Sequence, residues 1–163
     1  MSTPYVFRRF TPNEWPTIKE IRLAMLTADP TEFDTDRAVA EAADEAWWRL
    51  WATGTVRVPR ATWGVFQDAA CIGMVAAHSN RGQCHVGALW VRPDSRGTGA
   101  ARFLLDAAET WAHDVRCSRV VLGVRDQNPV KSYYERRHYV LTGRAVPTRW
   151  GHLELEMAKP VGK

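Results

Sequence analysis

The sequence lacks the cysteine pattern of a disulfide-bonded or metal-binding protein. Its 163 residues contain three cysteines, Cys71, Cys84 and Cys117, at irregular spacing. An odd number at such spacing fits neither a disulfide framework nor a paired-cysteine metal site. His85 directly follows Cys84, but no second pair of ligands accompanies them. We therefore expect reduced, mostly buried thiols and no bound metal.

Long apolar runs are also missing. No segment approaches the roughly 18 consecutive apolar residues that a membrane-spanning helix needs, and residues 1–15 lack the apolar stretch of a secretory signal. We expect a cytoplasmic protein without membrane contact. No internal repeat or low-complexity linker interrupts a chain that is 45% apolar and holds eight tryptophans. This composition predicts a single globular domain over residues 1–163.

Charge is unevenly distributed along the chain. The net charge is +4, yet residues 29–45 hold seven acidic residues and one basic residue, which leaves +10 for the remainder. Such a split predicts an anionic ligand on the basic body and a cationic ligand near the acidic segment. The alternative, that acidic residues gather where a helix dipole favours them, stays open. Basic residues are scattered, so we expect no nucleic-acid binding.

Hydrophobic periodicity predicts alternating strands and helices. The expected strands are residues 5–10, two strands within 61–79 joined by a turn at Gln67-Asp68, then 83–91, 119–124, 138–144 and 152–159. The expected helices are residues 12–29, 35–54, a central helix from Gly99 onward, and 129–137. The order β-α-α-β-β-β-α-β-α-β-β indicates a mixed α/β domain with a strand–turn–helix at its centre.

Two of these helices show an apolar stripe in the sequence. In residues 35–54 the stripe comprises Val39, Ala43, Trp47, Leu50 and Trp51. In the central helix it comprises Phe103, Leu104, Ala107, Ala108, Trp111 and Ala112. We expect both stripes to be buried.

A glycine-rich turn, "RGTGAA" at residues 96–101, begins the central helix. The first turn of a helix has backbone N–H groups without intrahelical partners and carries partial positive charge, and a phosphate satisfies both. Gly97 and Gly99 permit backbone conformations closed to other residues, while Arg96 adds a permanent cation. An ordinary flexible turn would also use glycine. The pattern favours a diphosphate site for a nucleotide cofactor.

Two other phosphate-binding motifs do not fit this turn. A nucleoside-triphosphate loop needs lysine and then serine or threonine after its last glycine, where this chain has Ala100 and Ala101. A dinucleotide fingerprint needs a third glycine where Arg102 stands. Excluding these two motifs leaves a cofactor that carries a diphosphate and needs no magnesium ligand.

Two segments resemble the signatures of the GNAT superfamily of acyl-CoA-dependent N-acyltransferases. The first signature, Arg/Gln-x-x-Gly-x-Gly/Ala, is matched by Arg96, Gly99 and Ala101. The second, an asparagine followed by a segment like "lYeklGF", is matched by "NPVKSYYERRHYVLTGR". The resemblance covers nearly the whole chain. It implies the GNAT fold, a mixed central sheet flanked by helices, with acetyl-CoA as cosubstrate.

The resemblance also implies roles for individual residues. The strand segment Leu89, Trp90 and Val91 would pair with the pantetheine arm, and the turn would hold the diphosphate. The turn residues are Arg96, Gly97, Thr98, Gly99, Ala100 and Ala101. Tyr134 matches the tyrosine that protonates the departing thiolate, and a tyrosine pKa near ~10 is close to that of an aliphatic thiol. Tyr133 in that role, or a merely packed aromatic, stays open.

Several positions depart from the family pattern. Asn128 stands six residues before Tyr134 where the family has seven, and Gln127 holds the usual spacing. Asn128 is expected to contact the cofactor, although it also fits a plain helix cap. His138 replaces the glycine of the second signature. His85 falls where relatives carry the glutamate base, and a histidine suits that role near neutral pH.

Water, Glu154 or Glu156 are the alternatives to His85 as the base. The sequence thus predicts an N-acetyltransferase acting on a primary amine of an unidentified small-molecule or peptide acceptor. The acceptor is expected to enter over residues 27–36, where neutralising Asp34 and Asp36 would raise the KM for the amine. A non-catalytic acyl-CoA-binding regulator, which would tolerate loss of Tyr134, is the alternative. The sequence leaves open whether the protein is a homodimer.

Overall fold

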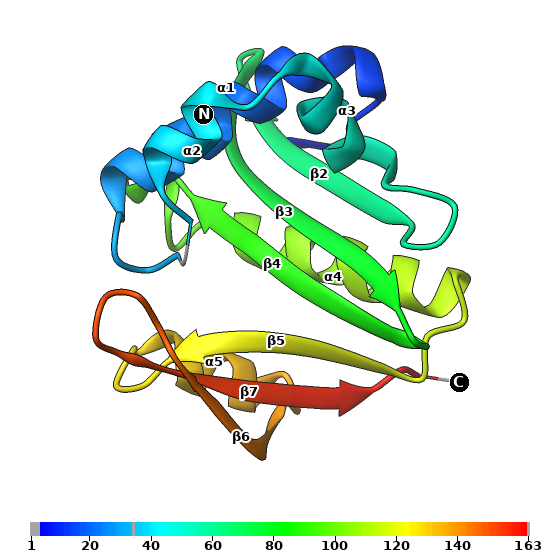
Figure 1. Cartoon of the computed structure of the whole chain (residues 1–163), viewed down its shortest axis with the longest axis vertical. Coiled ribbons are helices and arrows are strands. Elements are labelled where there is room, and N and C mark those ends of the chain that lie inside the picture. The colour runs from blue at the N-terminus through cyan, green and yellow to red at the C-terminus, as the bar shows by residue number, and fades with distance from the viewer. Residues whose placement is uncertain (1–3, 34, 163) are drawn as a thin grey trace.

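A seven-stranded mixed sheet organises the chain, with the strand order β1-β2-β3-β4-β5-β7-β6 (Figure 1). The structure is a computed structural model that describes residues 4–33 and 35–162. Its strands are β1 (Val6–Arg9), β2 (Arg60–Gln67), β3 (Ala70–Asn80), β4 (Gln83–Val91), β5 (Arg119–Arg125), β6 (Val140–Pro147) and β7 (Leu153–Pro160). Its helices are α1 (Trp15–Ala28), α2 (Arg37–Ala42), α3 (Glu45–Thr53), α4 (Ala100–Asp114) and α5 (Val130–Arg136), with short 3-10 turns η1 (Pro12–Glu14) and η2 (Pro93–Ser95). The predicted mixed α/β class is confirmed, and the elements follow the predicted order along the chain except that three helices, and not two, come between β1 and β2.

The helix expected over residues 35–54 is two helices, so that prediction was wrong. Ala43 is extended, and Asp44 begins α3 by accepting a hydrogen bond from the backbone N–H of Trp47. Because this cap interrupts the helix, the apolar stripe does not continue in phase. Val39 is 64% exposed and Leu50 44% exposed. The buried face of the two helices comprises Ala40, Trp48, Trp51 and Ala52.

The central helix α4 buries most of the residues of the predicted apolar stripe. Leu104, Ala108, Trp111 and Ala112 are buried as expected. Phe103 is instead 44% exposed and its ring packs against Phe7 of the edge strand, with 4.5 Å between ring centroids. Leu105 takes its place among the fully buried side chains. The predicted turn between β2 and β3 also lies one residue later, where Asp68 and Ala69 both have positive φ.

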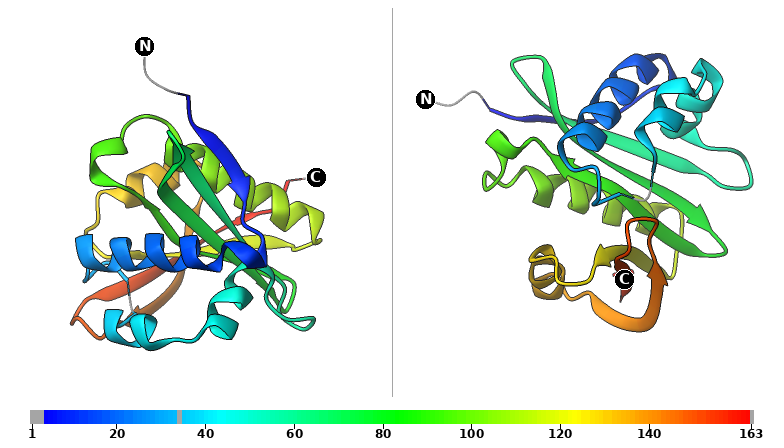
Figure 2. Two further views of the ribbon diagram at one scale, coloured as in Figure 1. Left: turned by 90° about the horizontal axis from the view of Figure 1, so that it is seen from above. Right: turned by 60° about the vertical axis from the view of Figure 1, so that its left-hand side comes forward.

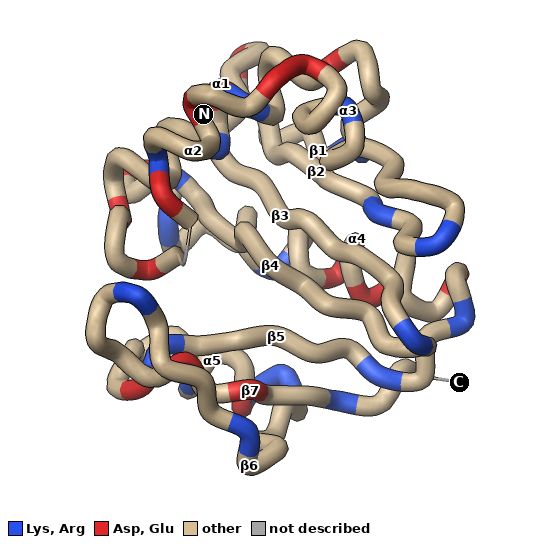
Figure 3. The backbone as a smooth tube through the Cα atoms, in the orientation of Figure 1, with Lys and Arg blue, Asp and Glu red and all other residues tan. Residues whose placement is uncertain are grey.

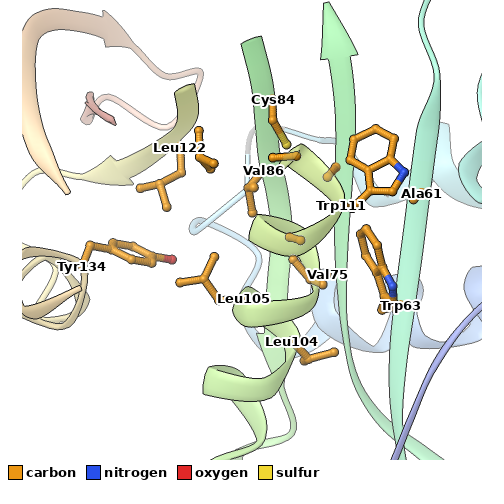
Figure 4. Close-up of a cluster of buried hydrophobic side chains, with 14 of the residues drawn as sticks. Ala61, Trp63, Val75, Cys84, Val86, Leu104, Leu105, Trp111, Leu122 and Tyr134 are labelled. Atoms are coloured by element: carbon orange, nitrogen blue, oxygen red, sulfur yellow. The ribbon is translucent and has the colours of Figure 1, made fainter. Parts of the chain in front are cut away.

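Helices cover both faces of the sheet. Helices α1 and α3 pack on one face around Trp48 and Met74, while α4 and α5 pack on the other around Leu104 and Tyr134. Figure 2 shows α1 and α4 on opposite sides of the sheet, and Figure 4 shows the cluster beneath α4. None of the helices in the described residues combines the length and apolar character needed to cross a membrane.

Strands β4 and β5 separate at one end of the sheet. They form the only parallel pair in the described sheet, and they pair solely between residues 83–86 and 119–122. Beyond these residues the two strands diverge (Figure 1). A bulge bends β4 at the same place, because Met74 of β3 faces Trp90 whereas Ala76 faces Gly87, and Ala88 between them has a φ of 55°. The divergence opens the sheet beside the start of α4.

Candidate active site

The glycine-rich turn is shaped to receive an anion. Gly97 and Gly99 have φ values of 76° and 89°, which glycine adopts without strain. A Cβ atom at either position would meet nothing within 4 Å, so the turn is open on its outer side. The Thr98 hydroxyl donates to the Ser95 carbonyl at 2.6 Å and steadies the loop. Among the described residues no side chain caps the first turn of α4, so its N–H groups can bind an external acceptor.

Arg96 is tied to the strand before it. Its Nε donates to the Val91 carbonyl at 2.9 Å, and its Nη2 donates to Asp29 Oδ2 at 3.0 Å. The same Asp29 oxygen accepts from the indole N–H of Trp90 at 2.7 Å. Asp29, at the end of α1, therefore fixes both the strand and the turn. Two of the five N–H groups of Arg96 are used in this way, and the others remain for an anion.

A cavity of about 450 Å³ lies between the diverging strands and the glycine turn, and we call it the glycine-turn cavity. The predicted site residues among its lining are Leu89, Trp90, Val91, Arg96, Ala101, Asn128 and Tyr134. Gly97, Thr98, Gly99 and Ala100 belong to the adjoining turn and do not line it. Residues from β4, β5, α4 and α5 thus meet at one site. An elongated ligand lying in this cavity would have the free N–H groups of α4 at one end.

Tyr134 is a buried residue in the lining of this cavity. It is 8% exposed, and Figure 4 shows its hydroxyl directed toward the α4 side chains around Leu105. Burial, and secondarily the neighbouring Tyr133, raises the pKa of Tyr134 to about 12. Tyr134 therefore keeps its proton at neutral pH and can donate it, although it is a weaker acid than an unperturbed tyrosine.

Asn128, and not Gln127, lines the glycine-turn cavity. Its Oδ1 accepts from the backbone N–H of Val130 at 2.9 Å at the start of α5, as the cap interpretation expects. Its Nδ2 donates to Glu32 Oε2 at 2.8 Å. Gln127 stands in the left-handed region with a φ of 70°. Asn128 therefore links α5 to the segment that follows α1.

The acidic segment after α1 is paired with arginines on the other side of the divergence. Glu32 forms an ion pair with Arg125 of β5 at 2.8 Å, and Asp36 forms one with Arg149 of the β6–β7 turn at 3.3 Å. Figure 3 shows acidic stretches of this segment on the side that faces the basic tip of the β6–β7 turn. Asp34 lies outside the described residues. In the described part, the expected anionic rim is a set of bridges between distant segments, which sequence reasoning missed.

A second cavity, of about 290 Å³, passes through the divergence to the opposite face of the sheet, and we call it the cross-sheet cavity. The residues that it shares with the glycine-turn cavity are Glu32, Phe33, Leu89, Gly123 and Tyr134. On the α1 side it is lined by Arg22, Phe33 and Thr35, and from β7 by Glu154. Tyr134 lines both cavities, whereas Tyr133 lines only the first.

His85 lies beyond the cross-sheet cavity. It lines a third space of about 280 Å³, the histidine cavity, with Arg144, Glu154 and Glu156. Its ring stacks on His78 with centroids 4.9 Å apart. Burial lowers the pKa of both rings, that of His78 to about 4. His85 is thus uncharged at neutral pH, but it lines neither of the two cavities that Tyr134 lines.

Glu154 lines both the cross-sheet and the histidine cavities. Its carboxylate lies over Gly123 of β5, where the Cβ of any other residue would collide with it. The absence of a side chain at Gly123 is therefore what lets the carboxylate reach the divergence. The alternating pattern of β7 indicated that Glu154 and Glu156 share a face, but only the strand order brings Glu154 to Gly123. In the described residues no three His, Cys, Asp or Glu side chains gather in a way that could hold a metal ion.

The sequence matches one family model. Residues 15–139 match the model described as the Acetyltransferase (GNAT) family. No sequence among the curated proteins matches the chain.

Solved structures share this fold over nearly its whole length. A GNAT-family acetyltransferase from Streptococcus pneumoniae superposes with a TM-score of 0.78 at 16% identity, covering 98% of this chain and 100% of the other. The ribosomal-protein-S18-alanine N-acetyltransferase of Escherichia coli gives 0.70 at 14% identity, covering 98% and 96%. The PaiA N-acetyltransferase of Thermoplasma acidophilum, in complex with coenzyme A, gives 0.62 at 16% identity, covering 94% and 98%. At such identities the likeness concerns the fold alone.

Proposed function

The chain belongs to the Acetyltransferase (GNAT) family, and we propose that it transfers an acetyl group from acetyl-CoA to the primary amine of a small-molecule or peptide acceptor. One observation carries the proposal. The divergent strands and Tyr134 line the glycine-turn cavity beside the glycine turn, and Tyr134 also lines the cross-sheet cavity. The cofactor would occupy the α4 side, and the acceptor would approach from the α1 side.

The residues of the glycine-turn cavity suit an acyl-CoA. When bound, acetyl-CoA supplies the thioester carbon that the amine attacks, so that a C–N bond replaces the C–S bond. The open turn at Gly97 and Gly99 and the uncapped N–H groups of α4 would hold the diphosphate. Residues 89–91 of β4, which do not pair with β5, would leave backbone groups for the pantetheine amides.

Tyr134 is proposed to donate the proton that the departing sulfur needs. Its high pKa keeps the phenol protonated, and its place in both cavities puts it where acceptor and cofactor would meet. Positioned proton transfer of this kind contributes roughly 10²- to 10⁴-fold to a rate. The phenolate formed would be reprotonated from solvent through the open cavity.

Glu154 is proposed to accept the proton from the acceptor's ammonium group. It shares the cross-sheet cavity with Tyr134, which His85 does not. A carboxylate there would also attract the ammonium group before deprotonation. His85 remains the second candidate, acting through water from the neighbouring cavity. Glu154→Gln should lower kcat at every pH, whereas a histidine base predicts that His85→Gln removes the acidic limb of the pH profile.

The test is calorimetric titration with acetyl-CoA followed by thiol release in the presence of a panel of primary amines. We expect acetyl-CoA binding and release of free thiol that depends on the added amine. Binding without release for any amine would favour the non-catalytic acyl-CoA-binding regulator. Well-folded protein that does not bind acetyl-CoA would contradict both the acetyltransferase and the acyl-CoA-binding regulator.

A further inference from the structure

Arg22 of α1 carries a buried charge with no acidic partner in the described residues. It is 6% exposed. Its Nη1 contacts the sulfur of Met25 at 2.7 Å, and its Nη2 donates to the hydroxyl of Thr35 at 3.0 Å. Within residues 4–33 and 35–162 its Nε is buried without a hydrogen-bond partner. A guanidinium that has left water normally pairs with a carboxylate, so this environment is unusual.

The surroundings of Arg22 compensate its charge only in part. The rings of Phe33 and Trp51 each have their centroid 5.3 Å from the guanidinium carbon, which provides cation–π attraction. Burial, and secondarily the charge of Arg60, lowers the pKa of Arg22 to about 10. The group therefore remains a cation at neutral pH. An anion arriving beside it would recover the lost solvation energy.

Arg22 lines the cross-sheet cavity, and so do its contacts Phe33 and Thr35. Tyr134, Glu154 and Glu32 line the same cavity, and Glu32 is already paired with Arg125 at 2.8 Å. The cavity volume of about 290 Å³ corresponds to on the order of ten water molecules, at about 30 Å³ each. A small molecule fits such a space. A cationic end could lie near Glu154 and an anionic end near Arg22.

We propose that Arg22 binds a carboxylate group of the acceptor, so that the acceptor is an amino acid with its amine directed to Glu154 and Tyr134. This inference rests on the proposed acetyl transfer and names the substrate class for it. The flat guanidinium matches a carboxylate in a two-pronged contact. Thr35, already bonded to Arg22, offers its hydroxyl to the same group.

Arg60 provides a matched control within the same cluster. Its guanidinium carbon lies over Trp51 at 3.8 Å from the ring centroid, and burial lowers its pKa to about 10. Its Nε, like that of Arg22, is buried without a hydrogen-bond partner among the residues that the structure describes. Arg60 lines none of the three cavities described above. A purely structural role for buried arginines around Trp51 predicts equal effects of Arg22→Met and Arg60→Met. A ligand role predicts that only Arg22→Met changes acceptor binding.

The experiment titrates CoA-saturated protein with pairs of compounds that differ only by a carboxylate. The pairs are glycine and methylamine, β-alanine and ethylamine, 4-aminobutanoate and propylamine, and phenylalanine and phenethylamine. We expect at least one amino acid to bind about 10- to 100-fold more tightly than its matched amine. Arg22→Met should abolish that preference, Arg22→Lys should keep part of it, and Arg60→Met should leave it intact. Thermal melting of each variant checks that it folds.

The outcomes separate this inference from the proposed function. Equal affinity within every pair, no binding of either member, or the same loss in Arg22→Met and Arg60→Met overturns the carboxylate site. Thiol release from acetyl-CoA is measured on the same pairs. Carboxylate-dependent binding without thiol release keeps the site and contradicts the transferase. Thiol release that is unchanged in Arg22→Met keeps the transferase and contradicts the carboxylate site.

Discussion

The two sides of the divergence between β4 and β5 are built in different ways. On the α4 side, the turn is made of neighbouring residues, and its binding groups are backbone N–H groups arranged by Gly97 and Gly99. On the α1 side, the cross-sheet cavity is lined by side chains brought from distant segments, such as Arg22 of α1 and Glu154 of β7. The backbone groups of the α4 side suit a ligand that is the same in every reaction, such as the cofactor. On the α1 side a few side chains determine which ligand binds, and substitutions can change them one at a time.

Loss of the Tyr134 hydroxyl should have the largest effect, because this group lies where the two sides meet. In Tyr134→Phe we expect kcat for thiol release to fall by about 10²- to 10⁴-fold. The KM for acetyl-CoA should change less than about twofold, since the ring still packs in the core. Tyr133→Phe, which alters only the α4 side, is the control. An unchanged kcat in Tyr134→Phe would remove this residue from the mechanism.

The backbone character of the α4 side predicts a large effect of Gly99→Ala on cofactor affinity. A Cβ at this position points into open space beside the turn, and its φ of 89° becomes strained. We expect the Kd for acetyl-CoA to rise about tenfold or more and stability to fall by about 1–2 kcal/mol. Gly82→Ala has the same strain, with a φ of 76°, at the far β3–β4 turn. Equal affinity in the two variants would show that the turn binds nothing.

The contrast also explains what the sequence could reveal. The glycine turn was predictable because local backbone demands dictate residue types over a few neighbouring positions, whereas Tyr134 was singled out only by its resemblance to a family signature. The break before Asp44 was missed because a cap can interrupt a continuous helical pattern. The proximity of Glu154 to Gly123 depends on β7 lying beside β5, which periodicity does not encode. Arg22 did leave a signal, since it interrupts the apolar face of α1.

A smaller effect, a loss of stability at low pH, is expected from the histidine and arginine side chains that lie close together on the α1 face of the sheet. Burial, then the neighbouring His85 and Arg60, lowers the pKa of His78 from 6.5 to about 4. Between these values the unfolded chain binds more protons than the folded one, so stability is full above pH 6.5 and declines toward pH 4. We expect the melting temperature to fall by a few degrees between pH 7 and pH 5. His78→Gln should reduce this decline.

The control for that experiment is the exposed His113 on the opposite side of the sheet. His113→Gln should melt with the same pH dependence as the wild type. An equal reduction in both variants would mean that the decline comes from the whole chain and not from the His78 environment.

The smallest effect should follow Asp36→Asn, which tests whether the bridged acidic segment still attracts an amine. Asp36 pairs with Arg149 at 3.3 Å and also caps α2 by accepting from the backbone N–H of Ala38. Asparagine keeps the cap, and an exposed ion pair contributes about 0–1 kcal/mol. We expect the KM for the amine to stay within about twofold. A clear rise in that KM alone would mean that the charge of Asp36 reaches the acceptor despite Arg149, and that long-range attraction adds to the side-chain contacts of the α1 side.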